Sequence, residues 1–274
     1  MPGGKGANVA VAAARVLGPS KVGILGTLGK DDIAEKQVQI FEQEGVVVSG
    51  LKFSADVESG QAYILIDEHG ENMIHSYRGA NSMILPEDLE EQVRSQLISD
   101  ASIITIMDPP FETSVKLARE AKRLGKIVAW DPGFYAEFGM KVRPLLENVD
   151  YLAANESETE HLTGMKTTRG AARVLMRANP KLKLITKLGA KGSILHEGTE
   201  RTVCPAFNLA PHGLRVVNTV GCGDAFLGAF VAALAEGRSD QEALKWANVA
   251  AGLKATRPET RGSPKRETLF RYLS

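Results

Sequence analysis

The sequence predicts an α/β fold, an open and mostly parallel sheet flanked by helices, with a small β lid. From residue 102 onward, short apolar runs typical of buried strands alternate with helical segments, the order of a βα fold. Before that point, Ser59 to Ile66 and Asn72 to Tyr77 alternate with period two and predict a hairpin. The 274 residues, 43% of them hydrophobic, suffice for one large core, so we expect a single domain over residues 1–274.

The first part of the chain is predicted to hold helices, one short strand and the hairpin. Gly18 and Gly45 mark the ends of the first two helices, because glycine commonly ends a helix. The predicted elements are a helix over 9–17, a strand over 21–26, a helix over 31–44, the hairpin over 59–77 and a helix that begins at Pro86. Since the hairpin interrupts the alternation of strands and helices, we expect residues 59–77 to project as part of a β lid.

The second part of the chain is predicted to supply the sheet and most of its helices. The expected strands are 102–107, 127–130, 151–153 and 182–187, followed by the antiparallel pair 193–196 and 201–204. The expected helices are 111–124, 225–236, 240–256 and one that begins at Lys265.

Charge and composition exclude several classes of function. Lysine and arginine number 33, as do aspartate and glutamate, and no basic cluster is interleaved with aromatics, so we expect neither nucleic acid nor a membrane surface as a partner. No segment resembles a signal peptide or is apolar enough to cross a bilayer, which predicts a cytoplasmic protein. The two cysteines, Cys204 and Cys222, are too few for a disulfide framework. A small molecule is the expected partner.

A glycine-rich turn near the C-terminal end leads directly into an apolar helix. Gly221, Cys222 and Gly223 would present backbone N–H groups at the helix N-terminus, where anions bind. The glycines also let a phosphate approach the backbone. Asp224 would take the proton from an attacking hydroxyl while the N–H groups stabilise a transferring phosphoryl group. The alternative is a tight turn in which Asp224 only caps the helix.

A second glycine-rich segment, Gly3 to Asn8, precedes the first predicted helix. Lys5 and Asn8 carry hydrogen-bond donors that suit the hydroxyls of a sugar. Glycines at the start of a chain normally fray. The alternative is therefore a flexible start with a solvated Lys5.

Polar residues follow the predicted parallel strands at the point where each strand ends. Asp108, Asp131 and Asn155 occupy these positions, and Glu158 follows shortly after Asn155. Ligands of open parallel sheets bind outside the carboxyl ends of the strands, so these residues are candidates for one cleft. The alternatives are local, because Asn155 with Glu158 also has the pattern of a capping box and aspartate before proline is an ordinary turn.

Taken together, the two glycine segments resemble the signature motifs of the ribokinase-like (PfkB) carbohydrate kinases. The stronger motifs are Gly3-Gly4-Lys5-Gly6-Ala7-Asn8 and Val220-Gly221-Cys222-Gly223-Asp224. Weaker ones occur in the family's order: Arg78-Gly79-Ala80-Asn81, Asn155-Glu156-Ser157-Glu158, Leu188-Gly189-Ala190-Lys191-Gly192 and Ala247-Asn248-Val249-Ala250-Ala251. The resemblance covers practically the whole chain and is closest to ribokinases. It implies a ribokinase-like fold in which ATP phosphorylates a sugar-type hydroxyl with Mg²⁺ present.

The resemblance also implies a role for each matching residue. Asp224 is the base on the acceptor hydroxyl, and the N–H groups of Gly221, Cys222 and Gly223 form the anion hole. The residues that match sugar-binding positions are Gly4, Lys5, Asn8 and Asp108. Those that match the nucleotide site are Asn155, Lys187, Gly189, Gly192 and Asn248, and Glu158 matches a residue that helps place Mg²⁺ through water. The hairpin would cover the sugar and exclude water.

The chain departs from the family pattern at three points. Asn218 stands where ribokinases have an aspartate that helps bind an activating monovalent cation, with carbonyls of the loop after the penultimate helix, so K⁺ stays open as a cofactor but is not favoured. Cys222 replaces a common alanine and adds a site of oxidation if its thiol is accessible. Family members usually carry a further N-terminal segment with the first core strand and the first lid strands. Without these strands we expect the chain to have weak kinase activity or none, and we expect a longer form that includes them to be active.

Ribose is the first choice of substrate, because the Gly3 to Asn8 and Arg78 to Asn81 segments look most like those of ribokinases. The alternatives are 2-keto-3-deoxygluconate, whose carboxylate Arg78 could hold, fructose, and a nucleoside. A non-catalytic nucleotide- or sugar-binding protein stays open as a different class of function, and the presence of Asp224 argues against it. Some relatives dimerise through lid strands, so a homodimer is one alternative to a monomer.

Overall fold

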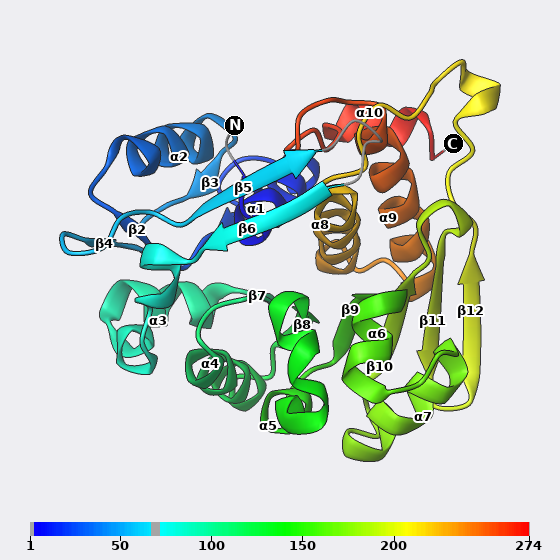
Figure 1. The fold of residues 1–274 in the computed structure, drawn as a ribbon, viewed down its shortest axis with the longest axis horizontal. Helices are drawn as coiled ribbons and strands as arrows, with labels where there is room; N and C mark the ends of the chain where they lie inside the picture. The colour runs from blue at the N-terminus through cyan, green and yellow to red at the C-terminus, as the bar shows by residue number, and fades with distance from the viewer. Residues whose placement is uncertain (1–2, 67–71, 274) are drawn as a thin grey trace.

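A six-stranded sheet forms the centre of the computed structural model, which describes residues 3–66 and 72–273. The strand order is β12-β11-β10-β9-β8-β7 (Figure 1). Strands β7 to β10 are parallel, and β11 and β12 add an antiparallel edge. The strands are β7 Ile103–Met107, β8 Ile127–Asp131, β9 Tyr151–Asn155, β10 Lys183–Lys187, β11 Ser193–Glu197 and β12 Glu200–Cys204. The predicted open, mostly parallel sheet is confirmed.

Helices cover both faces of this sheet (Figure 1). One layer consists of α1 Lys5–Leu17, α8 Cys222–Ala235, α9 Asp240–Ala255 and α10 Arg266–Arg271. The other consists of α3 Gln92–Asp100, α4 Phe111–Arg123, α5 Arg143–Leu146, α6 Glu156–Thr163 and α7 Thr168–Ala178. Successive strand residues enter opposite cores: Ala129 packs with the first layer, and Val128 and Trp130 with the second. Burial on both sides explains the continuous apolar runs in these strands.

The region before the hairpin contains more strands than the sequence predicts. The strand expected over 21–26 is reduced to β1 Val22–Gly23, which pairs with β3 Val46–Val47. A second parallel pair joins β2 Gly26–Gly29 to β4 Leu51–Ser54, and α2 spans Asp32–Gln43. Elements of two to four residues are too short to give a period, which is why β2, β3 and β4 were not predicted.

The predicted hairpin is confirmed as β5 Gln61–Ile66 paired with β6 Asn72–Tyr77. The expected turn over 67–71 lies outside the described residues. The base of the hairpin is fixed to the segment that follows it, since the N–H of Ala80 donates to the carbonyl of Glu58 at 2.8 Å. A Cβ on Gly60 would lie 2.2 Å from Asn81 Nδ2, so glycine is required for this approach.

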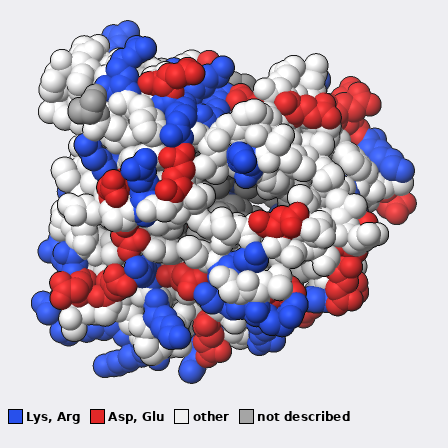
Figure 2. Space-filling model, turned by 180° about the vertical axis from the view of Figure 1, so that it is seen from behind, with Lys and Arg blue, Asp and Glu red and all other residues white. Residues whose placement is uncertain are grey.

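Short 3₁₀ helices make most of the remaining connections. They are η1 Gly79–Ser82, η2 Pro86–Glu90, η3 Gly133–Val142, η4 Gly189–Lys191 and η5 Ala210–His212. The helix predicted to begin at Pro86 is therefore η2 followed by α3. In the described part of the chain no helix is long and apolar enough to span a membrane. On the face shown in Figure 2, basic and acidic side chains are interspersed.

Helices α1 and α8 pack unusually close together, and this contact positions the site described below. A Cβ on Gly228 of α8 would lie 2.5 Å from the Cβ of Ala12 and 2.8 Å from the carbonyl oxygen of Val9. Only glycine at this position lets the two backbones approach so closely. Helix α8 is buried without a break from Asp224 to Ala233. The residues that follow Asp224 are apolar on all sides of the helix, as expected for a core helix.

Candidate active site

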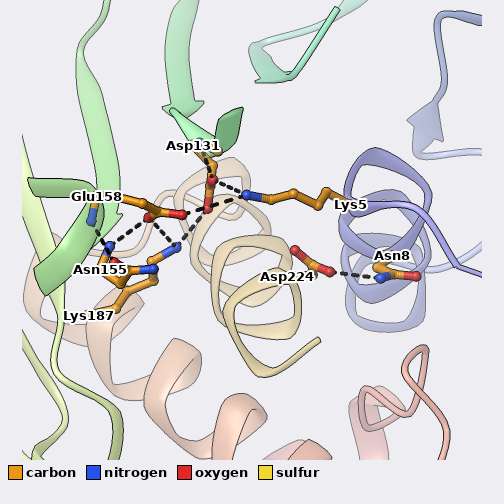
Figure 3. A network of polar contacts seen from close by, with 8 residues as sticks. Lys5, Asn8, Asp131, Asn155, Glu158, Lys187 and Asp224 are labelled. Atoms are coloured by element: carbon orange, nitrogen blue, oxygen red, sulfur yellow. Dashed lines mark hydrogen bonds and ion pairs between the residues drawn. The ribbon is translucent and has the colours of Figure 1, made fainter. Parts of the chain in front are cut away.

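The four parallel strands end in polar residues that lie along one edge of the sheet. Asp131, Asn155 and Lys187 are the last residues of β8, β9 and β10, and Asp108 follows β7. Asp131 is in register with Met107, and Lys187 with Asn155. The N-terminal ends of α1 and α8 bring Lys5 and Asp224 to the same place (Figure 3). The structure therefore brings these strand ends together at one edge of the sheet, and their sharing one ligand site stays a prediction.

Asp131 lies between two lysines that come from opposite ends of the sequence. Lys5 Nζ is 2.6 Å from Asp131 Oδ1, and Lys187 Nζ is 2.7 Å from Asp131 Oδ2 (Figure 3). Burial raises the pKa of Asp131, but the ammonium groups of Lys187 and Lys5 outweigh burial and bring it to about 2. The alternative of a flexible start with a solvated Lys5 is wrong, because Lys5 begins α1 and is bound to this carboxylate.

Glu158 takes part both in a helix cap and in the group of charged side chains at the strand ends. Asn155 and Glu158 form a capping box at the start of α6, so the structural alternative is present. The same carboxylate also lies 3.9 Å from both Lys5 Nζ and Lys187 Nζ. Glu158 therefore fixes the start of α6 and adds a second negative charge beside the two lysines.

Asp224 is buried in the first turn of α8 and does not cap the helix. The N-cap residue is Gly221, which makes no side-chain capping bond, so the capping alternative is wrong. Instead, Asp224 Oδ2 accepts a hydrogen bond of 2.7 Å from Asn8 Nδ2 (Figure 3). Burial raises the pKa of Asp224, and the Asn8 hydrogen bond and the ammonium groups of Lys5 and Lys187 oppose that rise.

The turn before Asp224 adopts a backbone conformation that requires glycine at position 221. Gly221 has φ of 87°, and a Cβ there would lie 2.2 Å from the carbonyl oxygen of Thr260. A Cβ on Gly223 would be 3.5 Å from Lys187 Nζ, so the turn lies beside that ammonium group. The N–H of Cys222 donates to the carbonyl of Thr219 at 3.1 Å and so has a partner within the turn. Burial also raises the pKa of the Cys222 thiol, which reduces its reactivity.

Arg261 is a buried site residue that the sequence analysis did not identify. Its Nε donates to Asn8 Oδ1 at 3.2 Å, and its terminal nitrogens donate to Gln37 Oε1 and to the carbonyl of Gly3. Because the amide oxygen of Asn8 accepts from Arg261, the amide nitrogen faces Asp224. Arg261 is an isolated arginine in the loop after α9, so no spacing or motif marks it.

Asp108 has an unusual backbone conformation and an incompletely satisfied carboxylate. Its φ is 53°, and among the described residues its buried Oδ1 has no hydrogen-bond partner. A Cβ on Gly133 would lie 2.4 Å from Asp108 Oδ2, so glycine makes room for the carboxylate. Burial raises the pKa of Asp108 to about 6, with Lys5 opposing and Asp131 reinforcing that rise. Arg78 donates to the carbonyl oxygen of Asp108 at 2.6 Å.

The remaining predicted residues take part in turns and in one cavity. Gly4 is the N-cap of α1 with φ of 94°. Gly189 begins η4, and a Cβ on Gly192 would lie 2.2 Å from the carbonyl oxygen of Cys204. Asn248 Nδ2 donates to Ser193 Oγ at 2.8 Å, and Asn248 lines a cavity of about 470 Å³. The cavity lies between α9 and the end of β12 and has Cys204, Phe207 and Tyr272 in its wall.

The oxygen donors at the strand ends fit a magnesium ion that is held mostly by phosphates and water. Asp131 and Glu158 offer two carboxylates beside Lys5 and Lys187. Mg²⁺ is commonly bound by one or two carboxylates together with substrate phosphates. Within residues 3–66 and 72–273, no three His, Cys, Asp or Glu side chains form a group that could hold a metal by themselves.

Comparison with known proteins identifies the family. The model of the pfkB family carbohydrate kinases matches residues 1–267. The chain belongs to this family. A ribokinase of Haemophilus influenzae is 31% identical to this pfkB kinase over 277 residues, 99% of this chain and 87% of that protein.

Solved structures of ribokinases have the same fold. The ribokinase of Thermotoga maritima has a TM-score of 0.86 at 30% identity, covering 100% of this pfkB kinase and 88% of that chain. The ribokinase of Arabidopsis thaliana, solved with ribose and ATP, has a TM-score of 0.85 at 28% identity, covering 99% and 87%. The predicted ribokinase-like fold is confirmed, and this pfkB kinase is an ATP-dependent sugar kinase.

Proposed function

We propose that this pfkB kinase phosphorylates a hydroxyl of ribose with ATP, and that Asp224 is the general base. The observation that carries the proposal is the buried Asp224 carboxylate, held by Asn8 and placed beside the glycine turn at the start of α8. Ribokinases are among its relatives at about 30% identity over nearly the whole chain, which supports ribose as the sugar.

Asp224 would accept the proton of the attacking sugar hydroxyl. Asn8 donates to Oδ2, so we assign Oδ1 to the proton of the attacking hydroxyl. The raised pKa of Asp224 makes the carboxylate a better proton acceptor than an exposed aspartate. Burial also keeps water from competing with the sugar for the phosphoryl group.

The sugar would lie between Asp224 and Asp108. The unpartnered Oδ1 of Asp108 is an acceptor suited to a sugar hydroxyl, and binding one there would satisfy a buried polar atom. Gly4, Lys5 and Asn8 border the same region from α1. The hairpin of β5 and β6 would close over the sugar as a lid and exclude water.

The phosphates of ATP would lie at the glycine turn. The N–H groups of Gly221 and Gly223 start α8, where the helix dipole favours anions, and Cys222 would join them if its bond to Thr219 opened. Lys187 lies beside Gly223, so its ammonium group can turn from Asp131 to a phosphate oxygen. This arrangement stabilises charge on the transferring group without a P-loop.

The rest of the nucleotide would extend along the ends of β9 and β10 and the start of β11. Asn155, Gly189 and Gly192 border this path, and the cavity beside Asn248 is large enough for a nucleoside. Asp131 and Glu158 would hold Mg²⁺, Glu158 through water. When bound, the ion would neutralise charge on the phosphates.

The alternatives to a ribose kinase are less well supported. Arg78 is engaged with the carbonyl of Asp108 and lies over the ring of Phe134, which leaves less of its guanidinium for the carboxylate of 2-keto-3-deoxygluconate. Fructose and a nucleoside remain the other substrate alternatives. A non-catalytic binding protein would not need a buried aspartate that does not cap its helix beside the proposed phosphate site.

The test is ADP release from ATP and Mg²⁺ with ribose, fructose, 2-keto-3-deoxygluconate or adenosine. We expect the highest kcat/KM with ribose. Asp224→Asn should lower kcat by on the order of 100-fold or more while ATP still binds. Asp100→Asn, which changes an exposed aspartate at the end of α3, is the control and should leave kcat unchanged. A better substrate than ribose would refute the sugar, and full activity of Asp224→Asn would refute the base.

A further inference from the structure

Lys254 is a fully buried lysine without an acidic partner. It lies in the last turn of α9, and its exposed fraction is 0%. Within the described residues, no carboxylate lies within ion-pairing distance of its Nζ. A buried charge without a counterion is costly, so lysines are rarely found in such a position.

The partners of this ammonium group are backbone carbonyl oxygens from two segments. Lys254 Nζ donates to the carbonyl of Asn218 at 2.8 Å and lies 3.5 Å from the carbonyl oxygen of Arg257. Burial lowers the pKa of Lys254, and the negative charges of Glu259 and Asp224 oppose that effect. Carbonyl oxygens are hard ligands of the kind that hold alkali cations elsewhere in proteins.

The two segments that Lys254 joins meet directly beneath the glycine turn. The N–H groups of Val217 and Asn218 both donate to the carbonyl of Ala255, at 2.8 Å and 3.0 Å. The side chain of Asn218 donates to the carbonyl of Pro258 and accepts from the N–H of Val220. These bonds fix the segment that enters residues 219–223 against the loop that leaves α9.

We propose that the ammonium group of Lys254 is a built-in cation that draws the carbonyls of residues 218 and 257 together and thereby positions the glycine turn for phosphoryl transfer. The lysine takes the role that a bound monovalent metal ion could otherwise fill, so the enzyme works without one. Lys254 is a positioning residue, because it acts through the turn. The inference rests on the proposed role of Gly221 and Gly223 as the anion site.

The test compares KCl with tetramethylammonium chloride at equal ionic strength, since tetramethylammonium is too large for a cradle of carbonyls. We expect the wild type to show the same kcat and the same Tm in both salts. Lys254→Ala should lose on the order of 100-fold in kcat in tetramethylammonium chloride, with a smaller change in the KM for ATP, because the turn is misplaced. Ethylammonium or K⁺ should restore part of that loss and raise the Tm of the variant.

Lys126→Ala is the matched control. Lys126 also donates to a backbone carbonyl, that of Ser99, but it lies just before β8, at the opposite end of that strand from Asp131. Its removal should change neither kcat nor the salt dependence. Lys254→Met, which keeps most of the buried length without the charge, replaces the alanine variant if the latter does not fold.

Three results would overturn the proposal. The first is a wild type that K⁺ activates or stabilises relative to tetramethylammonium. The second is a folded Lys254→Ala that keeps its full rate, and the third is a slow variant that neither ethylammonium nor K⁺ improves in rate or Tm. A wild type that phosphorylates no sugar would refute the proposed function instead, and the Tm comparison would still decide the role of Lys254.

Discussion

The amide nitrogen of Asn8 lies 2.7 Å from the carboxylate oxygen Oδ2 of Asp224, which joins two helices whose residues are 216 positions apart in the sequence. Arg261 holds the other end of the same amide. The orientation of the proposed base therefore depends on a chain of three side chains, one from each of α1, α8 and the loop after α9.

Asn8→Ala should shift the pH dependence of the reaction. The Asn8 hydrogen bond lowers the pKa of Asp224 against the effect of burial, so its loss raises that pKa further. A base works only when deprotonated, and the acid limb of kcat/KM should therefore move to higher pH. The measurement is a pH profile, with the exposed Asn148→Ala as control. An unshifted acid limb would show that Asn8 does not act on Asp224.

Asp108→Asn should make the protein more stable and a poorer enzyme. The pKa of Asp108 is raised from its ordinary 3.8 to about 6, so above pH 6 the ionised carboxylate destabilises the folded state. Urea unfolding at pH 8 should show a gain of roughly 2 kcal/mol for the variant, and the gain should shrink at pH 5, where the wild type is protonated. The KM for the sugar should rise. A variant less stable than the wild type at pH 8 would contradict this account.

Asp131→Asn should destabilise the protein strongly at neutral pH. The folded pKa of Asp131 is lowered to about 2, so its carboxylate stabilises the fold above pH 4, and this contribution is lost as the pH falls toward 2. The substitution leaves Lys5 and Lys187 with only the more distant carboxylate of Glu158, 3.9 Å from each ammonium group, and we expect a loss of about 3 kcal/mol in urea unfolding at pH 7. The loss should decrease at pH 3.

The matched control for Asp131 is an exposed ion pair. Glu147 lies 2.8 Å from Arg143 at the surface, and Glu147→Gln should change stability by no more than about 0.5 kcal/mol. Equal effects of Asp131→Asn and Glu147→Gln would show that the buried cluster contributes no more than a surface pair.

Gly228→Ala should lower stability although alanine is the better helix former. The new Cβ would collide with Ala12 and with the carbonyl of Val9, which outweighs the gain of about 1 kcal/mol in helix propensity. Forcing α1 from α8 should also separate Asn8 from Asp224 and reduce kcat. Thermal unfolding and ADP release test the two effects. An unchanged kcat in a destabilised variant would show that the contact between α1 and α8 does not position Asp224.

Much of the fold was predictable from the sequence because its core strands are apolar and several of its helices, such as α1 and α2, are followed by glycine. The ends of β7 to β10 carried Asp108, Asp131, Asn155 and a lysine, and the topology of a parallel sheet brings such positions together. The strands before the hairpin were missed, since pairs as short as Val22–Gly23 with Val46–Val47 have no recognisable period.

The parts of the site that the sequence could not show depend on contacts across the fold. Arg261 and Lys254 are single residues whose partners are an amide or backbone carbonyls, and neither leaves a pattern. Whether Asp224 capped α8 also could not be decided from its position, because a capping aspartate and a buried base have the same neighbours in sequence. Only the contact with Asn8 separates the two readings.

The burial of α8 divides the molecule into parts with different tolerance for change. From Asp224 to Ala233 the helix is inside the core, whereas Asp108 lies in the connection between β7 and α4. Substitutions accumulate more readily in such connections than in a packed helix. With Asp108 and Asp224 in the roles proposed above, sequence drift can therefore alter which sugar is accepted while the residues for phosphoryl transfer are inherited unchanged.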